Sequence, residues 1–362
     1  MMARTFALTA IAAAAMFTSS AHAVNPLSAK EIFTQFNVVT LGNLTSTQHV
    51  DGRTYVGGAL TGAQNVVVAM HPQDMPASNY AALTVMGQNL AAGQAAVNNV
   101  RVINGGAVVY GNIKDSEING GNSAVYGVSS HTSYNGTGSV YASGGYVDGG
   151  NVNVKKLASV AAGSVQATST AAANSTDMGK TLGAVSTWMS KYHSTGSSVD
   201  MNFKSGVATF NAGVQNGVAV FDLTGIDYNL FDSTKIKEFT FNLNGATSVY
   251  LNSDVTSAVI NDKFLGGGAQ KVGSALIWNF YNATDLTIGA QFGGSILATK
   301  ATLTNNQNIE GGVFVNNLVS NAEIHLDTFA GAVPEPETYA MMLAGLGLVG
   351  FIARRRKQAA AR

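Results

Sequence analysis

The side chains most often used for catalysis or metal binding are few and scattered in this chain of 362 residues. The histidines are His22, His49, His71, His131, His193 and His325. No pair of them has the H-E-x-x-H spacing that places two metal ligands on one helical face, and no G-x-S-x-G segment marks a nucleophile elbow. Cysteine is absent, which excludes a thiol nucleophile, a disulfide framework and a thiolate metal site. We therefore predict no catalytic residue, no metal and no cofactor.

The polar group that most suggests a catalytic site is Asp51-Gly52-Arg53, which has His49 two residues before it. Glycan hydrolases and lyases built on stacked strands cluster such acidic and basic residues on adjacent turns of the chain. The simpler interpretation, which we favour, is a turn in which Asp51 bonds its own backbone and Gly52 adopts positive φ.

Other short patterns carry less information. Asp222 and Asp227 are close in sequence, but two carboxylates near a turn are common. The glycines at Gly149-Gly150 lack the repeating calcium-binding pattern. The run Gly266-Gly267-Gly268 is not followed by the Lys-Ser/Thr pair of a phosphate-binding loop. None of these patterns predicts a catalytic or ligand site.

The C-terminal segment 333–357 has three parts in a fixed order. Val333, Pro334, Glu335 and Pro336 come first, and the prolines favour an extended backbone that a processing enzyme can bind. An uncharged stretch, 338–353, follows and can enter a bilayer. The basic block Arg354, Arg355, Arg356 and Lys357 then holds that end on the cytoplasmic face.

This order resembles the PEP-CTERM sorting signal of Gram-negative bacteria. The resemblance implies processing by an exosortase-type enzyme and transient anchoring in the inner membrane through a hydrophobic helix, before transfer to the cell surface or extracellular matrix. Residues 358–362 form the end of the basic tail. An ordinary C-terminal membrane anchor is the alternative interpretation.

The N-terminus has the features of a signal peptide. Arg4 precedes an apolar run, 6–17, and the small residues Ala21-His22-Ala23 fit a cleavage site. We predict a signal peptide over 1–23, cut after Ala23. The remaining segment, 24–332, has 14 Lys+Arg and 18 Asp+Glu, so its net charge is about −4. A mildly acidic surface argues against nucleic-acid binding, which needs clustered positive charge.

Short strand-like runs recur through the segment 24–332. Val109-Tyr110-Gly111, Val125-Tyr126-Gly127 and Val140-Tyr141-Ala142 are spaced by 16 and 15 residues. Gly294–Ala298 and Gly312–Asn316 are similar runs that lie 18 residues apart. This spacing predicts a mainly β, β-solenoid-like domain, in which each turn covers the apolar edge of the previous one. An antiparallel sandwich is the competing architecture, although its turns are usually closer together.

A helical insertion is expected at about 153–194. Met178, Leu182, Val185, Met189 and Tyr192 lie on one stripe of an α-helix, which we predict to pack along the outside of the strands. We expect Leu182 and Trp188 both to be largely buried. The Ala-rich stretch 154–173 is also predicted to be helical.

Two further groups of residues resemble a known family, the bacterial choice-of-anchor A domain. The first is Phe36-Asn37-Val38-Val39 with Val50-Asp51-Gly52-Arg53 and Val56-Gly57-Gly58. The second is Ile277-Trp278-Asn279-Phe280, Gly294–Ala298 and Asn308-Ile309-Glu310-Gly311-Gly312. The chain departs from the family at Ala298-Thr299-Lys300, where Ala-Pro is common. The resemblance covers about 29–329 and implies a secreted, surface-associated protein; some relatives are described as adhesive.

Two hypotheses for the function remain open. The first is a structural or adhesive protein without enzymatic activity, which binds exopolysaccharide or matrix proteins through polar faces. The tyrosines Tyr110, Tyr126 and Tyr141 could be exposed on such a face or packed inward. The second is a glycan-active hydrolase or lyase on the same scaffold. Ice binding would need ranks of threonine at the strand period, and the runs 45–47 and 168–170 are not repeated along the chain.

Overall fold

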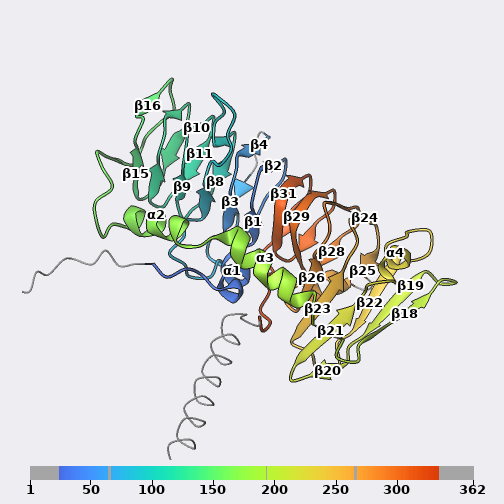
Figure 1. Ribbon diagram of the computed structural model, residues 1–362. Coiled ribbons are helices and arrows are strands. Elements are labelled where there is room, and N and C mark those ends of the chain that lie inside the picture. The colour runs from blue at the N-terminus through green and yellow to red at the C-terminus, as the bar shows by residue number, and fades with distance from the viewer. Residues whose placement is uncertain (1–23, 64–66, 193, 265–266, 334–362) are drawn as a thin grey trace, which may run out of the picture.

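The computed structural model describes residues 24–63, 67–192, 194–264 and 267–333 (Figure 1). The predicted signal peptide with Ala21 and Ala23, the motif residues Pro334, Glu335 and Pro336, and the block 354–357 lie outside the described residues. Within the described ranges, no helix is long and apolar enough to cross a membrane.

The described residues are mainly β-strand, and most strands pair in parallel. Strands β10 (Ile113–Lys114), β11 (Glu117–Asn119) and β12 (Ser123–Val125) are followed by β13 (Ser129–Ser130), β14 (Ser133–Asn135) and β15 (Ser139–Ala142). The first three of these strands pair with the next three in the same order, β10 with β13, β11 with β14 and β12 with β15, as in Ile113↔Ser129 and Ser123↔Val140. The predicted recurrence of strand-like runs therefore corresponds to the sequence separation between residues that pair on adjacent strands. Because the pairing is parallel, the alternative prediction of an antiparallel sandwich is wrong.

Three rows of paired strands run along the molecule, and we name them by what covers or lines them. The helix-covered face contains β17 (Lys155–Leu157), β15, β12, β9 (Ala107–Val109), β6 (Leu83–Val85), β3 (Thr54–Val56), β1 (Val38–Thr40), β31 (Val313–Ser320), β29 (Ser295–Asn305), β26 (Leu276–Phe280), β23 (Ser248–Ser253) and β21 (Val218–Asp222). The open face contains β16 (Tyr146–Val147), β13, β10, β7 (Val97–Asn98), β4 (Leu60–Gly62), β2 (Leu44–Ser46), the C-terminal parts of β31 and β29, β27 (Asp285–Ile288) and β24 (Ser257–Ile260). The polar face contains β14, β11, β8 (Arg101–Val102), β5 (Val67–Val68), Val50, β32 (Ile324–His325), β30 (Ile309–Glu310) and β28 (Phe292–Gly293).

The two ends of the folded chain meet in the middle of these rows. Strand β1 pairs with β3 on one side and with β31 on the other, so Val38 lies opposite both Thr54 and Val313. From this junction the first half of the chain extends in one direction to β17. The second half returns from the other end, and Figure 1 shows its orange strands beside the blue ones. Segments about 275 residues apart in sequence therefore form adjacent strands.

The far end is closed by a small sheet, which Figure 1 shows beyond β23 and β21. It is formed by β18 (Ser198–Asn202), β19 (Val207–Asn211), β22 (Glu238–Asn242) and β25 (Lys263–Phe264), and β20 (Val214–Gln215) and α4 (Asp227–Leu230) lie beside it. Its aromatic residues pack on the core. Phe210, for example, lies 5.9 Å from Trp278, centroid to centroid.

Strand β26 shows how the interior is built. Its alternate residues Leu276, Trp278 and Phe280 are buried in the main core, and the indole Nε1 donates to the carbonyl of Gly293 at 3.0 Å. Ile277 and Asn279 point the other way, toward the helices. The period-two alternation of a strand thus assigns one set to the core and the other to the helix contact.

The helices α1 (Ala29–Gln35), α2 (Val165–Ser175) and α3 (Met178–Met189) cover one row of strands (Figure 1). Ser28 and Glu31 form a capping box that starts α1, and Asp177 caps α3 through the amide of Lys180. Leu182 of α3 is fully buried, as predicted, whereas Trp188 is only partly buried.

The helical insertion is shorter than expected. The N-terminal part of the predicted helix 154–173 contains β17, whose residues pair with β15 as one more strand of the row. Lys155 and Lys156 are exposed there. Alanine content alone gave the wrong prediction because strand pairing at the end of the row overrides helix propensity.

Glycines occupy the corners where one turn of the chain lies against the next. Gly106 and Gly121 have φ of 69° and 81°, and a Cβ on Gly121 would lie 2.2 Å from the Gly106 nitrogen. Both the left-handed conformation and the close approach of backbones require glycine at these positions.

Candidate binding faces

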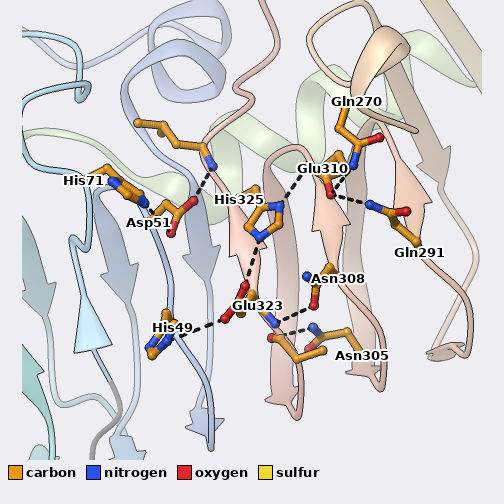
Figure 2. A network of polar contacts seen from close by, with 12 residues as sticks. His49, Asp51, His71, Gln270, Gln291, Asn305, Asn308, Glu310, Glu323 and His325 are labelled. Carbon is orange, nitrogen blue, oxygen red and sulfur yellow. Dashed lines mark hydrogen bonds and ion pairs between the residues drawn. The ribbon is translucent and has the colours of Figure 1, made fainter. Parts of the chain in front are cut away.

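A cluster of acids and histidines lies on the polar face where the two halves of the chain meet (Figure 2). The buried carboxylate of Glu310 lies 2.8 Å from Nδ1 of His325 and accepts hydrogen bonds from Gln291 at 2.7 Å and Gln270 at 3.2 Å. The other ring nitrogen of His325 lies 3.1 Å from Glu323. We call these residues, with His49, Asp51 and His71, the seam cluster.

The electrostatics of the seam cluster favour a charged His325. The hydrogen bond to Glu310 raises the pKa of His325 to about 9, although burial acts in the opposite direction. Burial alone would raise the pKa of Glu310, but the hydrogen bonds from His325 and Gln291 hold it below its usual value. Nearby, burial and the charge of Glu310 raise the pKa of Asp327 to about 6.

The first half of the chain contributes the rest of the seam cluster. His49 Nε2 lies 3.6 Å from Glu323, and His71 Nε2 lies 3.7 Å from Asp51. Asp51 also accepts a hydrogen bond from the backbone amide of Leu326 at 3.3 Å. The contacts therefore join residues 49–71 to residues 310–326 across the junction.

The predicted group Asp51-Gly52-Arg53 is structural, but not as the turn that we expected. Asp51 bonds a distant backbone amide, and Gly52 is needed because a Cβ would lie 2.7 Å from Cβ of Asn37 as well as 2.6 Å from Cδ1 of Leu326. Arg53 is 6% exposed and donates to the carbonyls of Gln35 and Pro76 at 2.8 and 3.1 Å. Among the described residues, no group of three or more His, Cys, Asp or Glu could hold a metal ion.

Asparagine and charged side chains continue the polar face along β8, β11 and β14. Asn153 donates to Asn135 at 2.8 Å, and Asn135 donates to Asn119 at 3.1 Å, which makes a ladder across successive turns of the chain. Beside it, Arg101 pairs with Glu117 at 3.3 Å. These side chains present amide, carboxylate and guanidinium groups on one surface.

Threonine and valine dominate the centre of the open face. The strand registers place Val259, Thr287, Thr304, Val319, Thr45 and Thr61 side by side on six adjacent strands. Their side chains are exposed or half-exposed, and Val259 reaches 54%. We call these six residues the β-branched rank. The rank cannot be recognised from either half of the sequence alone, because its members come from both halves.

The three recurring tyrosines lie near α2. The rings of Tyr110 and Tyr126 stack with centroids 4.8 Å apart, and Tyr141 contacts Tyr126 edge-on at 6.0 Å. The Tyr126 hydroxyl bonds Thr170 of α2 at 2.9 Å, and Tyr110 bonds Asn174. All three are half-buried, so neither full exposure nor full burial describes them.

The acids Asp222 and Asp227 serve separate structural roles. Asp227 is buried and accepts a hydrogen bond from the hydroxyl of Ser253 at 2.8 Å. Asp222 is exposed and accepts from the amide of Thr224 at 3.1 Å.

Comparison with protein families agrees with an adhesive surface. A model described as "Putative Ice-binding-like adhesive domain" matches residues 29–326. The chain belongs to this ice-binding-like adhesive family. A second model, the PEP-CTERM protein-sorting motif, matches residues 332–357. Neither the curated proteins nor the solved structures searched contain a match.

The two family matches divide the chain into an adhesive domain and a sorting signal. Together they make this an exported surface protein, and the sorting motif is of the kind recognised by exosortase. The adhesive family agrees with a non-enzymatic role. The narrower assignment to the choice-of-anchor A domain remains a prediction.

Proposed function

We propose that the protein is an adhesin of the cell surface or extracellular matrix of a Gram-negative bacterium, without enzymatic activity. The scaffold would be a β-solenoid-like stack whose faces carry the contacts. The observation that carries the proposal is the polar face, which extends from the asparagine ladder to the seam cluster. Amides and carboxylates in regular rows suit a ligand that offers many hydroxyl or amide groups, such as exopolysaccharide or a matrix protein.

The C-terminal sorting motif supports the same proposal. The first residues of the matched sorting motif are held by the domain, because the amide of Ala332 donates to the hydroxyl of Ser248 at 2.7 Å and Val333 is buried. We propose that the tail from Pro334 onward holds the chain briefly in the inner membrane and is then processed by an exosortase-type enzyme.

Binding through the polar face can be tested on arrays of glycans and matrix proteins. The triple variant Asn119→Ala, Asn135→Ala, Asn153→Ala removes the ladder, and we expect its apparent affinity to fall on the order of tenfold or more, since repeated weak contacts add in avidity. Each single substitution should have a much smaller effect.

A matched control removes amides from another part of the molecule. Asn306 and Asn321 bond each other at 3.0 Å and are exposed, so the double variant Asn306→Ala, Asn321→Ala should bind the array as the wild type does. Equal binding by the triple variant and the wild type would contradict the proposed face. Failure of the wild type to bind any glycan or matrix protein would contradict the adhesive function.

A further inference from the structure

A pocket of about 480 Å³ lies between the α2–α3 connection and the helix-covered face. The residues that directly follow β1, β3 and β6 line its strand side: Leu41, Gly57 and Met86. The amide of Gly57 bonds the carbonyl of Thr40, and the amide of Met86 bonds that of Val56, both at 2.8 Å, so the three residues lie side by side. A pocket of this size is large enough to hold a small ligand.

The glycine at position 57 makes the hollow. Its neighbours in this row, Leu41 and Met86, carry long apolar side chains that form the walls on either side. A Cβ on Gly57 would collide with the carbonyl oxygen of Leu41, so no side chain can fill the space between them. The gap is therefore set by the close approach of the two backbones.

The hydroxyl of Tyr55 is a buried polar group of the pocket. Tyr55 is only 6% exposed, and its ring packs edge-on against Phe36 with the centroids 6.3 Å apart. Burial, together with the nearby Tyr80 and Asp177, raises the pKa of Tyr55, so the hydroxyl keeps its proton. Within the described ranges, this hydroxyl makes no hydrogen bond. A ligand that bonds it would remove the cost of an unpaired buried hydroxyl.

The α2–α3 connection supplies hydrogen-bond acceptors on the other side of the pocket. The amide nitrogen of Asn174 donates to the Tyr110 hydroxyl and to the Thr170 carbonyl, which leaves its amide oxygen available. One carboxylate oxygen of Asp177 accepts from the amide of Lys180 at 2.9 Å, and the other has no hydrogen bond in the part of the chain that the structure describes. The pocket thus combines one hydroxyl with two oxygen acceptors.

This combination suits a sugar residue. A pyranose ring carries hydroxyls that both donate and accept, and its C–H groups suit the apolar side chains of Leu41, Met86 and Met178. Asp177 is the only charged side chain among the described residues that line the pocket, and it already caps the N-terminus of α3. A phosphate or a uronic acid would therefore meet a negative charge and no cation.

We propose that this pocket binds one uncharged sugar residue through hydrogen bonds to Tyr55, Asn174 and Asp177. The site lies on the helix-covered face and is separate from the polar face that carries the proposed adhesion. The rows of the polar face would bind a long ligand at many points, whereas the pocket recognises a single residue. It would give the protein a preference for one sugar that the polar face does not supply.

The test is saturation-transfer NMR on the full-length chain, held in micelles of a detergent without sugar groups. Methyl glucoside, methyl galactoside, methyl mannoside and N-acetylglucosamine are the uncharged probes, and glucuronate is the charged comparison. We expect at least one uncharged probe to bind, and glucuronate to bind at least about tenfold more weakly because Asp177 repels it.

Two conservative variants test the proposed hydrogen bonds. Tyr55→Phe removes only the hydroxyl, and Asp177→Asn removes the charge but keeps a side chain that caps helices well. Each should raise the Kd of the bound sugar on the order of tenfold, since each removes or weakens a hydrogen bond in a partly buried site. These variants keep the test valid if a larger change in the pocket prevents folding.

Two glycines of α3 give a matched pair of larger changes. Gly179 lines the pocket, and a Cβ there would lie 3.8 Å from Cδ1 of Leu41, whereas nothing lies within 4 Å of a Cβ on Gly183. Both positions should tolerate glutamine, which favours a helix more than glycine does. We expect Gly179→Gln to fill the pocket and abolish sugar binding, and Gly183→Gln to bind as the wild type does.

The proposal would be overturned if the wild type bound none of the uncharged probes, or bound glucuronate equally well. Unchanged binding by folded Gly179→Gln, or by both Tyr55→Phe and Asp177→Asn, would also overturn it. The triple variant Asn119→Ala, Asn135→Ala, Asn153→Ala leaves the pocket intact and should keep the Kd of the single sugar. The pocket and the polar face can therefore fail independently, because the arrays measure the polar face and the soluble sugars measure the pocket.

Discussion

At the scale of single residues, the seam cluster shows how charge holds two distant parts of the chain together. Glu310 is buried, and its negative charge is balanced by His325 and by two glutamine amides. A buried carboxylate without such partners would be costly, so the contacts with His325 and the glutamines stabilise Glu310 in the fold. His49 and Asp51 are close in sequence, but in the fold His49 lies beside Glu323 and Asp51 beside His71.

Stability should fall at alkaline pH because of His325. Its pKa of about 9 in the folded protein lies above the usual 6.5, so its stabilisation is complete below about pH 6.5 and is lost as the pH rises through 9. Since the side chain is 31% exposed, we expect a loss of roughly 1–2 kcal/mol after solvent screening. Urea unfolding between pH 6 and pH 10 measures this slope.

The variant His325→Gln should flatten that pH profile. The control His131→Gln changes an exposed histidine and should keep the slope of the wild type. An unchanged slope in His325→Gln would show that the seam cluster contributes nothing to the pH dependence.

At the scale of elements, α3 is fixed to the strands by both apolar and polar contacts. Leu182 is fully buried, and the side chains of Asn279 and Asn252 bond the backbone of α3 at Ser186 and Met189. The sequence motif around Trp278 thus has two purposes: the indole fills the core and the next residue holds the helix. Only the apolar stripe of α3 could be predicted from the sequence, because the asparagine contacts depend on which strand lies beneath the helix.

Truncation of α3 should destabilise the domain unequally. Leu182→Ala leaves a cavity in a fully buried site, and we expect a cost of roughly 2–5 kcal/mol. Trp188→Ala should cost less, since that ring is partly exposed and rests against Tyr192 at 4.7 Å. Thermal melting measures both, with the exposed Thr187→Ala as the control. A melting temperature unchanged in Leu182→Ala would mean that α3 does not dock as described.

At the scale of the whole molecule, the last strands of the domain pair with its first strands. Strands β1 and β2 lie between the first half of the chain and β31, so the final strands complete rows that the first strands begin. Val333, which lies within the matched sorting motif, is still buried against the domain.

The mature protein should lack both terminal signals. We expect intact-mass analysis of secreted material to give a chain that begins at Val24 and ends near Pro334–Pro336. The physical reason is that the basic block 354–357 resists translocation and leaves the tail available in the membrane. Secreted protein that still carries Arg354 to Arg356 would contradict processing, and the variant Glu335→Ala tests whether the motif is needed.

Features that depend on local patterns could be predicted from the amino-acid sequence. The sorting motif, the α3 stripe, the spacing of the strands and the lack of catalytic motifs can all be seen in short windows. Which residues share a face depends instead on how distant strands pair. Thr45 and Thr304 are about 260 residues apart, and they share the β-branched rank only because β31 pairs with β2. Likewise, His325 meets His49 and Asp51 at one seam because strand pairing at the junction joins two segments that no sequence pattern connects.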